Sequence, residues 1–152
     1  MVSLKPDAKV ALLASIPLFA HCNKRDLRRI AALTSAVEVP AGDVLCREGT
    51  PGSEFFVIVD GAAVITVGGK PVAKIGSGDF CGELALLDGG PRIASVTTTE
   101  PTRVLVLHRG EFEGLLVVAP DIGHNLLTAL AGRLRDADRP PEERTSPGVI
   151  GA

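Results

Sequence analysis

Apolar residues change their spacing along the chain, and the first part follows a helical pattern. The spacing predicts short helices over residues 9–15 and 24–34, with Asn23 as the N-cap of the second helix and Asp26 at its N3 position. Pro17 is expected to break the chain between the two helices. In the second helix the apolar positions are Leu27, Ile30, Ala31 and Leu33.

Between residues 36 and 108, short β-branched runs separated by glycine and proline clusters replace the helical pattern. The runs predicted to be strands are 37–39, 44–46, 55–59, 62–67, 72–75, 94–98 and 103–107. Strands this short and this closely spaced favour an antiparallel barrel or jelly roll. Gly68 and Gly69 predict a tight hairpin turn between two of them.

Helical spacing returns over residues 110–118 and 121–137, and Pro120 stands where the second helix starts. The apolar stripe of that helix consists of Ile122, Leu126, Leu127, Leu130 and Leu134. The predicted fold is therefore mainly β with flanking α-helices: an N-terminal helical segment, an antiparallel β-roll and a C-terminal helix pair. We expect one domain over residues 1–138, followed by a Pro-rich, disordered tail over 139–152.

Composition narrows the class of protein. A chain of 152 residues with 45% hydrophobic and 22% charged residues suits one globular domain. A net charge of −2 gives no broad electrostatic footprint for nucleic acid. No apolar run approaches the roughly 20 residues that span a bilayer, and the N-terminus lacks the apolar stretch of a signal peptide. We therefore expect a cytoplasmic chain that contacts neither nucleic acid nor membrane.

The cysteines and histidines do not form a pattern that indicates catalysis. The three cysteines are scattered without a C-x-x-C pair, so buried free thiols are the simplest interpretation. The three histidines are isolated, which disfavours a metal site and the metal-dependent enzymes that also use β-rolls. We expect a protein that is not an enzyme and needs no cofactor.

Residues 78–96 carry the most informative chemistry. Glu83 and Arg92 lie nine residues apart, with a glycine-rich turn between them. The planar guanidinium of arginine suits phosphate oxygens, and a glutamate accepts a hydrogen bond from a sugar hydroxyl. A glycine-rich backbone lets amide N–H groups close on an anion. Such a cassette can hold the sugar and phosphate of a nucleotide without a metal.

This segment resembles the phosphate-binding cassette of the cyclic nucleotide-binding domain family, of the catabolite activator and protein kinase A regulatory subunit type. The family pattern reads roughly Phe-Gly-Glu-Leu-Ala-Leu, a short linker, then Pro-Arg-x-Ala-Ser/Thr-Val. Here the two parts are residues 81–86 and 91–96, and Cys81 at a packing position is the one clear departure. A looser resemblance extends from about Leu12 to about Asp138.

The resemblance implies roles for the cassette residues. Arg92 would bind the phosphate and Glu83 the ribose 2′-hydroxyl, while a helical turn after Gly82 would aim backbone N–H groups at the anion. Ile93 would offer its backbone N–H, and its aliphatic side chain favours cAMP over cGMP. Ser95 would contact phosphate or simply fill the sheet. The expected ligand-binding residues are Gly82, Glu83, Leu84, Ala85, Arg92, Ile93, Ala94 and Ser95.

The base of the nucleotide requires an apolar slot. Candidate slot residues on the strands are Val64, Val72 and Ile75. The last helix has two interpretations: ordinary core packing, which is favoured, or a cover over the base. The residues that would reach the base are Leu126, Leu130, Arg133 and Leu134.

The leading hypothesis is a cyclic nucleotide sensor that relays binding by a movement of its C-terminal helix. A ligand-free docking module of the same fold is the alternative, and a small β-roll enzyme is less favoured. Bacterial regulators of this family carry a helix-turn-helix domain after the long helix; with about 14 residues after the last helix here, we expect no such domain. The resemblance allows a homodimer and leaves the downstream protein or fused effector open. We lean towards a stand-alone chain or an N-terminal domain.

Overall fold

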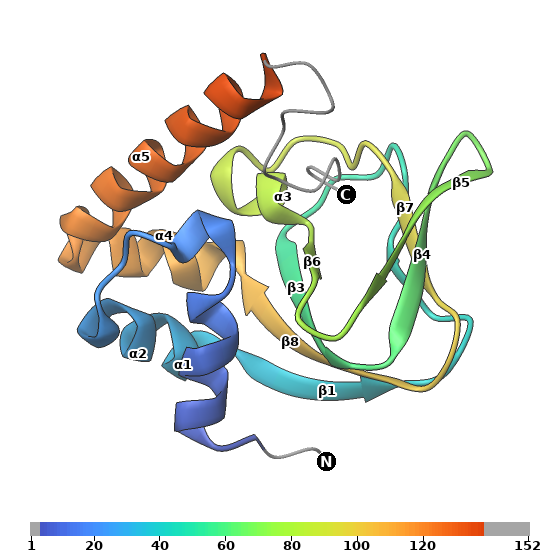
Figure 1. The fold of residues 1–152 in the computed structure, drawn as a ribbon, viewed down its shortest axis with the longest axis horizontal. Helices are drawn as coiled ribbons and strands as arrows, with labels where there is room; N and C mark the ends of the chain where they lie inside the picture. The colour runs from blue at the N-terminus through green and yellow to red at the C-terminus, as the bar shows by residue number, and fades with distance from the viewer. Residues whose placement is uncertain (1–3, 139–152) are drawn as a thin grey trace.

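The computed structural model describes residues 4–138, without the side chains of Arg133 and Ala137. Helical elements stand at both ends of the chain and eight strands lie between them, with one short helix among the strands (Figure 1). The helices are α1 Pro6–Ala14, η1 Pro17–Phe19, α2 Lys24–Leu33, α3 Glu83–Leu87, α4 Arg109–Val118 and α5 Pro120–Ala137. The strands are β1 Ser35–Val39, β2 Val44–Cys46, β3 Glu54–Asp60, β4 Ala62–Val67, β5 Lys70–Gly76, β6 Phe80–Cys81, β7 Ser95–Thr98 and β8 Thr102–His108.

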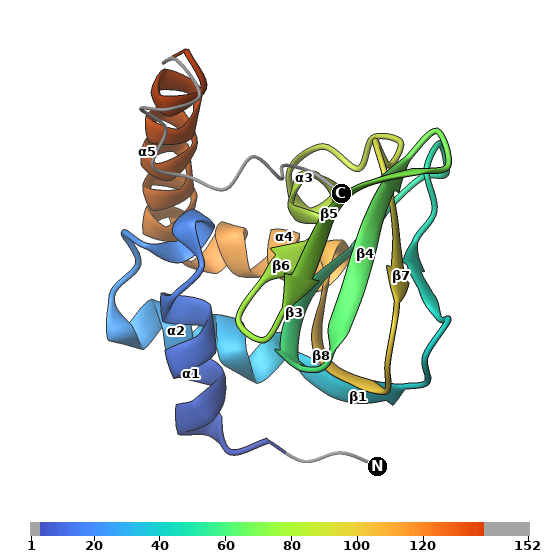
Figure 2. The ribbon, with the colours of Figure 1, turned by 45° about the vertical axis from the view of Figure 1, so that its right-hand side comes forward.

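The strands form two four-stranded sheets that close into a roll. One sheet has the order β1-β8-β3-β6 and the other β2-β7-β4-β5, with antiparallel pairing between neighbours. Helices α1, α2 and α4 lie against the outer side of the first sheet, and the second sheet faces its inner side (Figure 2). The predicted antiparallel β-roll with flanking helices is therefore confirmed.

The first sheet separates two hydrophobic cores. Because side chains alternate along a strand, Phe55 faces the helices and Phe56 faces the interior of the roll. The helix-side core is anchored by Phe19, whose ring packs edge-on to those of Phe55 at 6.0 Å and Phe112 at 6.2 Å. The strands β3 and β8 thus supply residues to both cores at once.

Local signals in the sequence explain several element boundaries. The Asn23 side chain accepts a hydrogen bond of 2.8 Å from the backbone N–H of Asp26, which confirms the predicted N-cap of α2. Gly68 and Gly69 have φ values of 58° and 80°, which is the backbone of the predicted hairpin turn between β4 and β5.

Two short elements were not predicted. Strand β6 has only two residues and lies in a glycine-rich stretch, so no alternation could reveal it. The 3₁₀ helix η1 begins at Pro17, where the sequence predicted only a break. A proline can end one helix and also begin the next one. At the first helical position its missing N–H costs nothing, because that N–H would have no intrahelical acceptor.

Helix α5 uses only the first half of its apolar stripe for packing. Ile122 and Leu126 are buried in the helix-side core, and Leu130 packs partly against it. Leu127 and Leu134 are 67% and 70% exposed. Core packing is therefore confirmed for the first half only, and α5 extends away from the roll (Figures 1 and 2).

The tail predicted over residues 139–152 lies outside the described residues. Within residues 4–138, no single helix is long and apolar enough to cross a membrane. Helices α4 and α5 reach the length and hydropathy of a membrane span only when they are counted together, and they are sharply bent relative to each other.

Candidate functional site

The backbone around Arg92 is fixed to the loop that precedes β3. Pro91 forms an isolated antiparallel bridge with Pro51, the Arg92 N–H donates to the Thr50 carbonyl at 2.8 Å, and the Arg92 carbonyl accepts from Gly49 at 2.8 Å. Residues 49–52 therefore determine where the Arg92 side chain leaves the backbone.

The Arg92 side chain is buried, with 6% of its surface exposed. Its Nη2 donates to the backbone carbonyl of Glu54 at 2.9 Å. Within residues 4–138 its buried Nη1 has no hydrogen-bond partner. A buried cation without full hydrogen bonding is costly, so this nitrogen is well placed to bind an anion.

Two glycines make room for the guanidinium. A Cβ at Gly82 would lie 2.7 Å from the Arg92 Nη1 and 2.5 Å from the Glu54 carbonyl oxygen. A Cβ at Gly52 would overlap the guanidinium itself. Gly82 also has a φ of 83°, a backbone angle that residues other than glycine rarely adopt. Backbone without side chains therefore lies close to Arg92 on two sides.

Helix α3 begins directly after Gly82, which is its N-cap. Glu83 is 1% exposed and Ala85 is buried, whereas Leu84 is half-buried. The Ala85 N–H donates to the Gly82 carbonyl at 3.0 Å, so this amide is used inside the turn. The structure thus brings Gly82 and Arg92 into contact. Glu83 directly follows Gly82 in the chain and is buried.

The three residues after Arg92 lie in different environments. The Ile93 side chain is 52% exposed, and Ala94 is buried in the core of the roll. The Ser95 hydroxyl accepts a hydrogen bond of 2.9 Å from the backbone N–H of Glu48, so in this structure it stabilises the neighbouring backbone.

The three strand residues suggested for the base do not share one environment. Ile75 is buried in the roll core, Val64 is half-buried, and Val72 is 60% exposed. Alternation along a strand does not show which of its two faces points inward, so the sequence alone does not separate these three positions.

All three cysteines are buried and free, as the sequence predicted. Burial, followed by the Asp26 carboxylate, raises the pKa of the Cys22 thiol to about 11. Cys81 is 2% exposed, in agreement with a packing role at that position. Among the described residues, no group of three or more His, Cys, Asp or Glu side chains could hold a metal ion.

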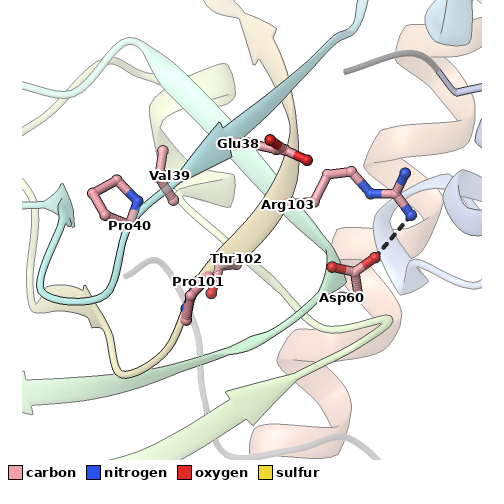
Figure 3. Close-up of a pocket in the computed structure, with 7 residues that line it drawn as sticks. All are labelled: Glu38, Val39, Pro40, Asp60, Pro101, Thr102 and Arg103. Atoms are coloured by element: carbon pink, nitrogen blue, oxygen red, sulfur yellow. Dashed lines mark hydrogen bonds and ion pairs between the residues drawn. The ribbon is translucent and has the colours of Figure 1, made fainter. Parts of the chain in front are cut away.

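A separate hollow of about 430 Å³ lies at the end of β1, beside the start of β8 (Figure 3). Its lining residues are Glu38, Val39, Pro40, Asp60, Pro101, Thr102 and Arg103. Arg103 donates to Asp60 at 2.8 Å, in an ion pair whose carboxylate side is exposed and whose arginine is partly buried. Arg103 therefore already has a carboxylate partner, although its buried Nε has no hydrogen-bond partner within residues 4–138. An anion would have to compete with Asp60 for Arg103, whereas the Arg92 guanidinium donates to a backbone carbonyl.

Sequence reasoning missed two parts of the cassette, Gly52 and the Glu54 carbonyl. In the sequence, the cluster at residues 49–52 indicates only a break between strands. A glycine two residues before a buried strand gives a weak signal of close approach.

The comparisons with known proteins agree with this geometry. A sequence model described as "Cyclic nucleotide-binding domain" matches residues 36–117. A cyclic nucleotide-gated potassium channel of Rhizobium etli is 35% identical over 133 residues, which are 87% of this chain and 36% of the channel. The chain spans about a third of the length of the first curated relatives it matches.

Two solved structures are also similar. The N-terminal domain of a transcriptional regulator from Streptomyces coelicolor has a TM-score of 0.77 and 32% identity, covering 84% of this chain and 94% of that one. The regulatory domain of Toxoplasma gondii PKA, crystallised with cAMP, has a TM-score of 0.66 and 27% identity, covering 72% of this chain and 43% of that one.

Proposed function

The chain belongs to the cyclic nucleotide-binding domain family, and we propose that it is a sensor that binds cAMP in preference to cGMP. The observation that carries this proposal is the buried Arg92 guanidinium, whose Nη1 has no acceptor within residues 4–138. A cyclic phosphodiester carries one negative charge and two exocyclic oxygens. It would complete the hydrogen bonding of Arg92 and offset the cost of burying the cation.

The other cassette residues would hold the sugar and the remaining phosphate oxygen. We assign the ribose 2′-hydroxyl to Glu83 and close backbone contacts to Gly82, Leu84 and Ala85. The backbone N–H of Ile93 would meet the phosphate, while its aliphatic side chain offers no hydroxyl to a guanine. Ala94 and Ser95 would support the cassette from the sheet. Binding would need no metal and no cofactor, and the chain would catalyse no reaction.

The preference for cAMP has support from one relative. The similar Toxoplasma domain was crystallised with cAMP. Here the side chain after the cassette arginine is Ile93, which cannot donate a hydrogen bond to a purine.

A thermal melt with four nucleotides tests the proposal. At a concentration one hundred times Kd, a ligand that binds only the folded state adds about 2.7 kcal/mol. For a domain of this size that is a rise in Tm of about 5–10 °C. We expect this rise with cAMP, a smaller one with cGMP, and none with linear AMP or ATP. A flat Tm with both cyclic nucleotides would refute the proposed function.

Replacing Glu83 with alanine should weaken cAMP binding by about 1.5–3 kcal/mol, because a hydrogen bond to a charged acceptor is lost. The same replacement should weaken 2′-deoxy-cAMP by less than half as much, since that ligand lacks the hydroxyl. Titration calorimetry with both ligands measures the difference. Equal losses would show that Glu83 does not read the ribose.

Arg109 offers a route from the cassette to the C-terminal helices. A Cβ at Gly89 would overlap the Arg109 guanidinium, so the cassette loop lies against the first residue of α4. Helix α5 follows α4 after one residue. We propose that ligand binding shifts the population of α5 orientations through this contact. A fused effector or a separate downstream protein would read that shift.

A further inference from the structure

Cys46 and Cys81 are buried in the same core inside the roll. Cys46 ends β2 of one sheet, and Cys81 ends β6 of the other. Both are 2% exposed and belong to the same buried core. Each thiol shifts the pKa of the other through a side-chain hydrogen bond, which makes the two sulfurs near neighbours. Two neighbouring thiols on different sheets can form a disulfide when their Cβ atoms approach to about 3.5–4.5 Å.

Both cysteines stand on short edge strands. Strands β2 and β6 have three and two residues, and each lies at the edge of its sheet. The pairing of β2 with β7 is also irregular between Val44 and Cys46. Short edge strands with few hydrogen bonds open locally at low cost, so a small oxidant can reach the buried sulfurs.

The surroundings make one thiol more reactive than the other. The hydrogen bond from Cys81 lowers the pKa of Cys46 despite its burial, and the nearby Arg92 charge lowers it further, while Glu54 opposes this. The hydrogen bond with Cys46 raises the pKa of Cys81, and burial raises it too. Cys46 therefore ionises first, and the thiolate is the form that attacks.

We propose that Cys46 and Cys81 are a redox site, which a peroxide converts to an intramolecular disulfide that weakens cyclic nucleotide binding. The Cys46 thiolate attacks one peroxide oxygen, the O–O bond breaks, and water leaves after protonation. The Cys81 sulfur then attacks the resulting Cys46 sulfenic acid, and the S–O bond breaks with loss of a second water. Two thiols lose two electrons and hydrogen peroxide accepts them.

The effect on binding follows from the position of Cys81 and rests on the proposed function. Cys81 immediately precedes Gly82, which lies against the Arg92 Nη1 and the Glu54 carbonyl. A sulfur–sulfur bond is shorter than a thiol contact, so it draws Cys81 towards β2 and displaces Gly82. We expect the disulfide to weaken cAMP binding by about tenfold.

Mass spectrometry of the folded protein tests the redox site without any ligand. The reduced chain is treated with hydrogen peroxide, quenched with catalase, unfolded and alkylated, and its peptides are mapped. We expect one Cys46–Cys81 disulfide and an alkylated Cys22, since the high pKa of Cys22 leaves little thiolate. C22S should still form the disulfide, and neither C46S nor C81S should. Alkylation of both Cys46 and Cys81, or sulfinic acid without a disulfide, would overturn the proposal.

Binding measurements then separate this inference from the proposed function. Labelled cAMP is titrated into the reduced and the oxidised forms of C22S, with peroxide-treated C46S as the matched control. The oxidised form should bind about tenfold more weakly and recover with a dithiol reductant. Equal affinities of the two forms would refute the effect on binding. If the mapped disulfide forms but the reduced protein binds no cyclic nucleotide, only the proposed function fails.

Discussion

Replacing Arg92 with alanine is expected to weaken cAMP binding by at least about 2 kcal/mol, or about thirtyfold. The replacement removes a charge-assisted hydrogen bond and the cation that opposes the phosphate. Titration with labelled cAMP measures the loss, because the chain has no Trp or Tyr for intrinsic fluorescence. The ligand-free protein should melt within a few degrees of the unchanged chain, since a buried and incompletely paired cation contributes little to stability.

Arg103 provides the matched control for this experiment. It is also an arginine of the β-roll, but it lies in the hollow of Figure 3 and pairs with the exposed Asp60. Replacing Arg103 with alanine should leave cAMP affinity within about twofold, because exposed pairs contribute little. Unchanged affinity in the Arg92 variant, or equal losses in both variants, would remove Arg92 from the binding site.

Replacing Gly82 with alanine should abolish measurable cAMP binding and lower the free energy of unfolding by about 2–4 kcal/mol. Two costs add up at this position. The first is the φ of 83°, and the second is the overlap of the new Cβ with the Glu54 carbonyl and the Arg92 Nη1. The carbonyl belongs to β3 and cannot move far, so Arg92 or the start of α3 must shift. Urea unfolding and cAMP titration measure the two effects.

Gly78 allows the two costs to be separated. Its φ of 87° is nearly the same, but a Cβ there would meet nothing within 4 Å. Replacing Gly78 with alanine should therefore cost only about 1–2 kcal/mol of stability and leave binding intact. If the two alanine variants lose the same stability and the same affinity, the positive φ alone accounts for the requirement for glycine at position 82. The close approach of Gly82 to Arg92 would then have no effect on binding.

The strands that the sequence predicted well are those with long β-branched runs. For β3 and β4 the expected and observed ranges agree within a residue, because their residues favour a pleated and buried surface. Strand β6 could not be predicted, since it exists only through its pairing with Phe56 and Val57. Helix α5 was predicted as amphipathic, but periodicity does not say which part of a stripe meets a neighbour.

The residues of the cassette that belong to the recognised sequence motif could be predicted, and the residues outside that motif could not. Arg92 and Gly82 were identified in this way, and the structure brings them together. Gly52 was not identified, because a glycine that makes room for a distant side chain has no local signature. The contact between Cys46 and Cys81 was missed for a similar reason: it joins edge strands of different sheets, and only the closed roll makes them neighbours.

The first sheet, which separates the two cores, has a consequence for engineering. Within three consecutive residues of β3, the Glu54 carbonyl holds Arg92, Phe55 packs on Phe19 in the helix-side core, and Phe56 lines the roll. If the proposed function holds, we therefore expect changes at Phe19 that raise heat tolerance to alter cyclic nucleotide affinity as well. Libraries that seek a new ligand range should keep this strand constant and diversify the exposed position at Ile93 instead.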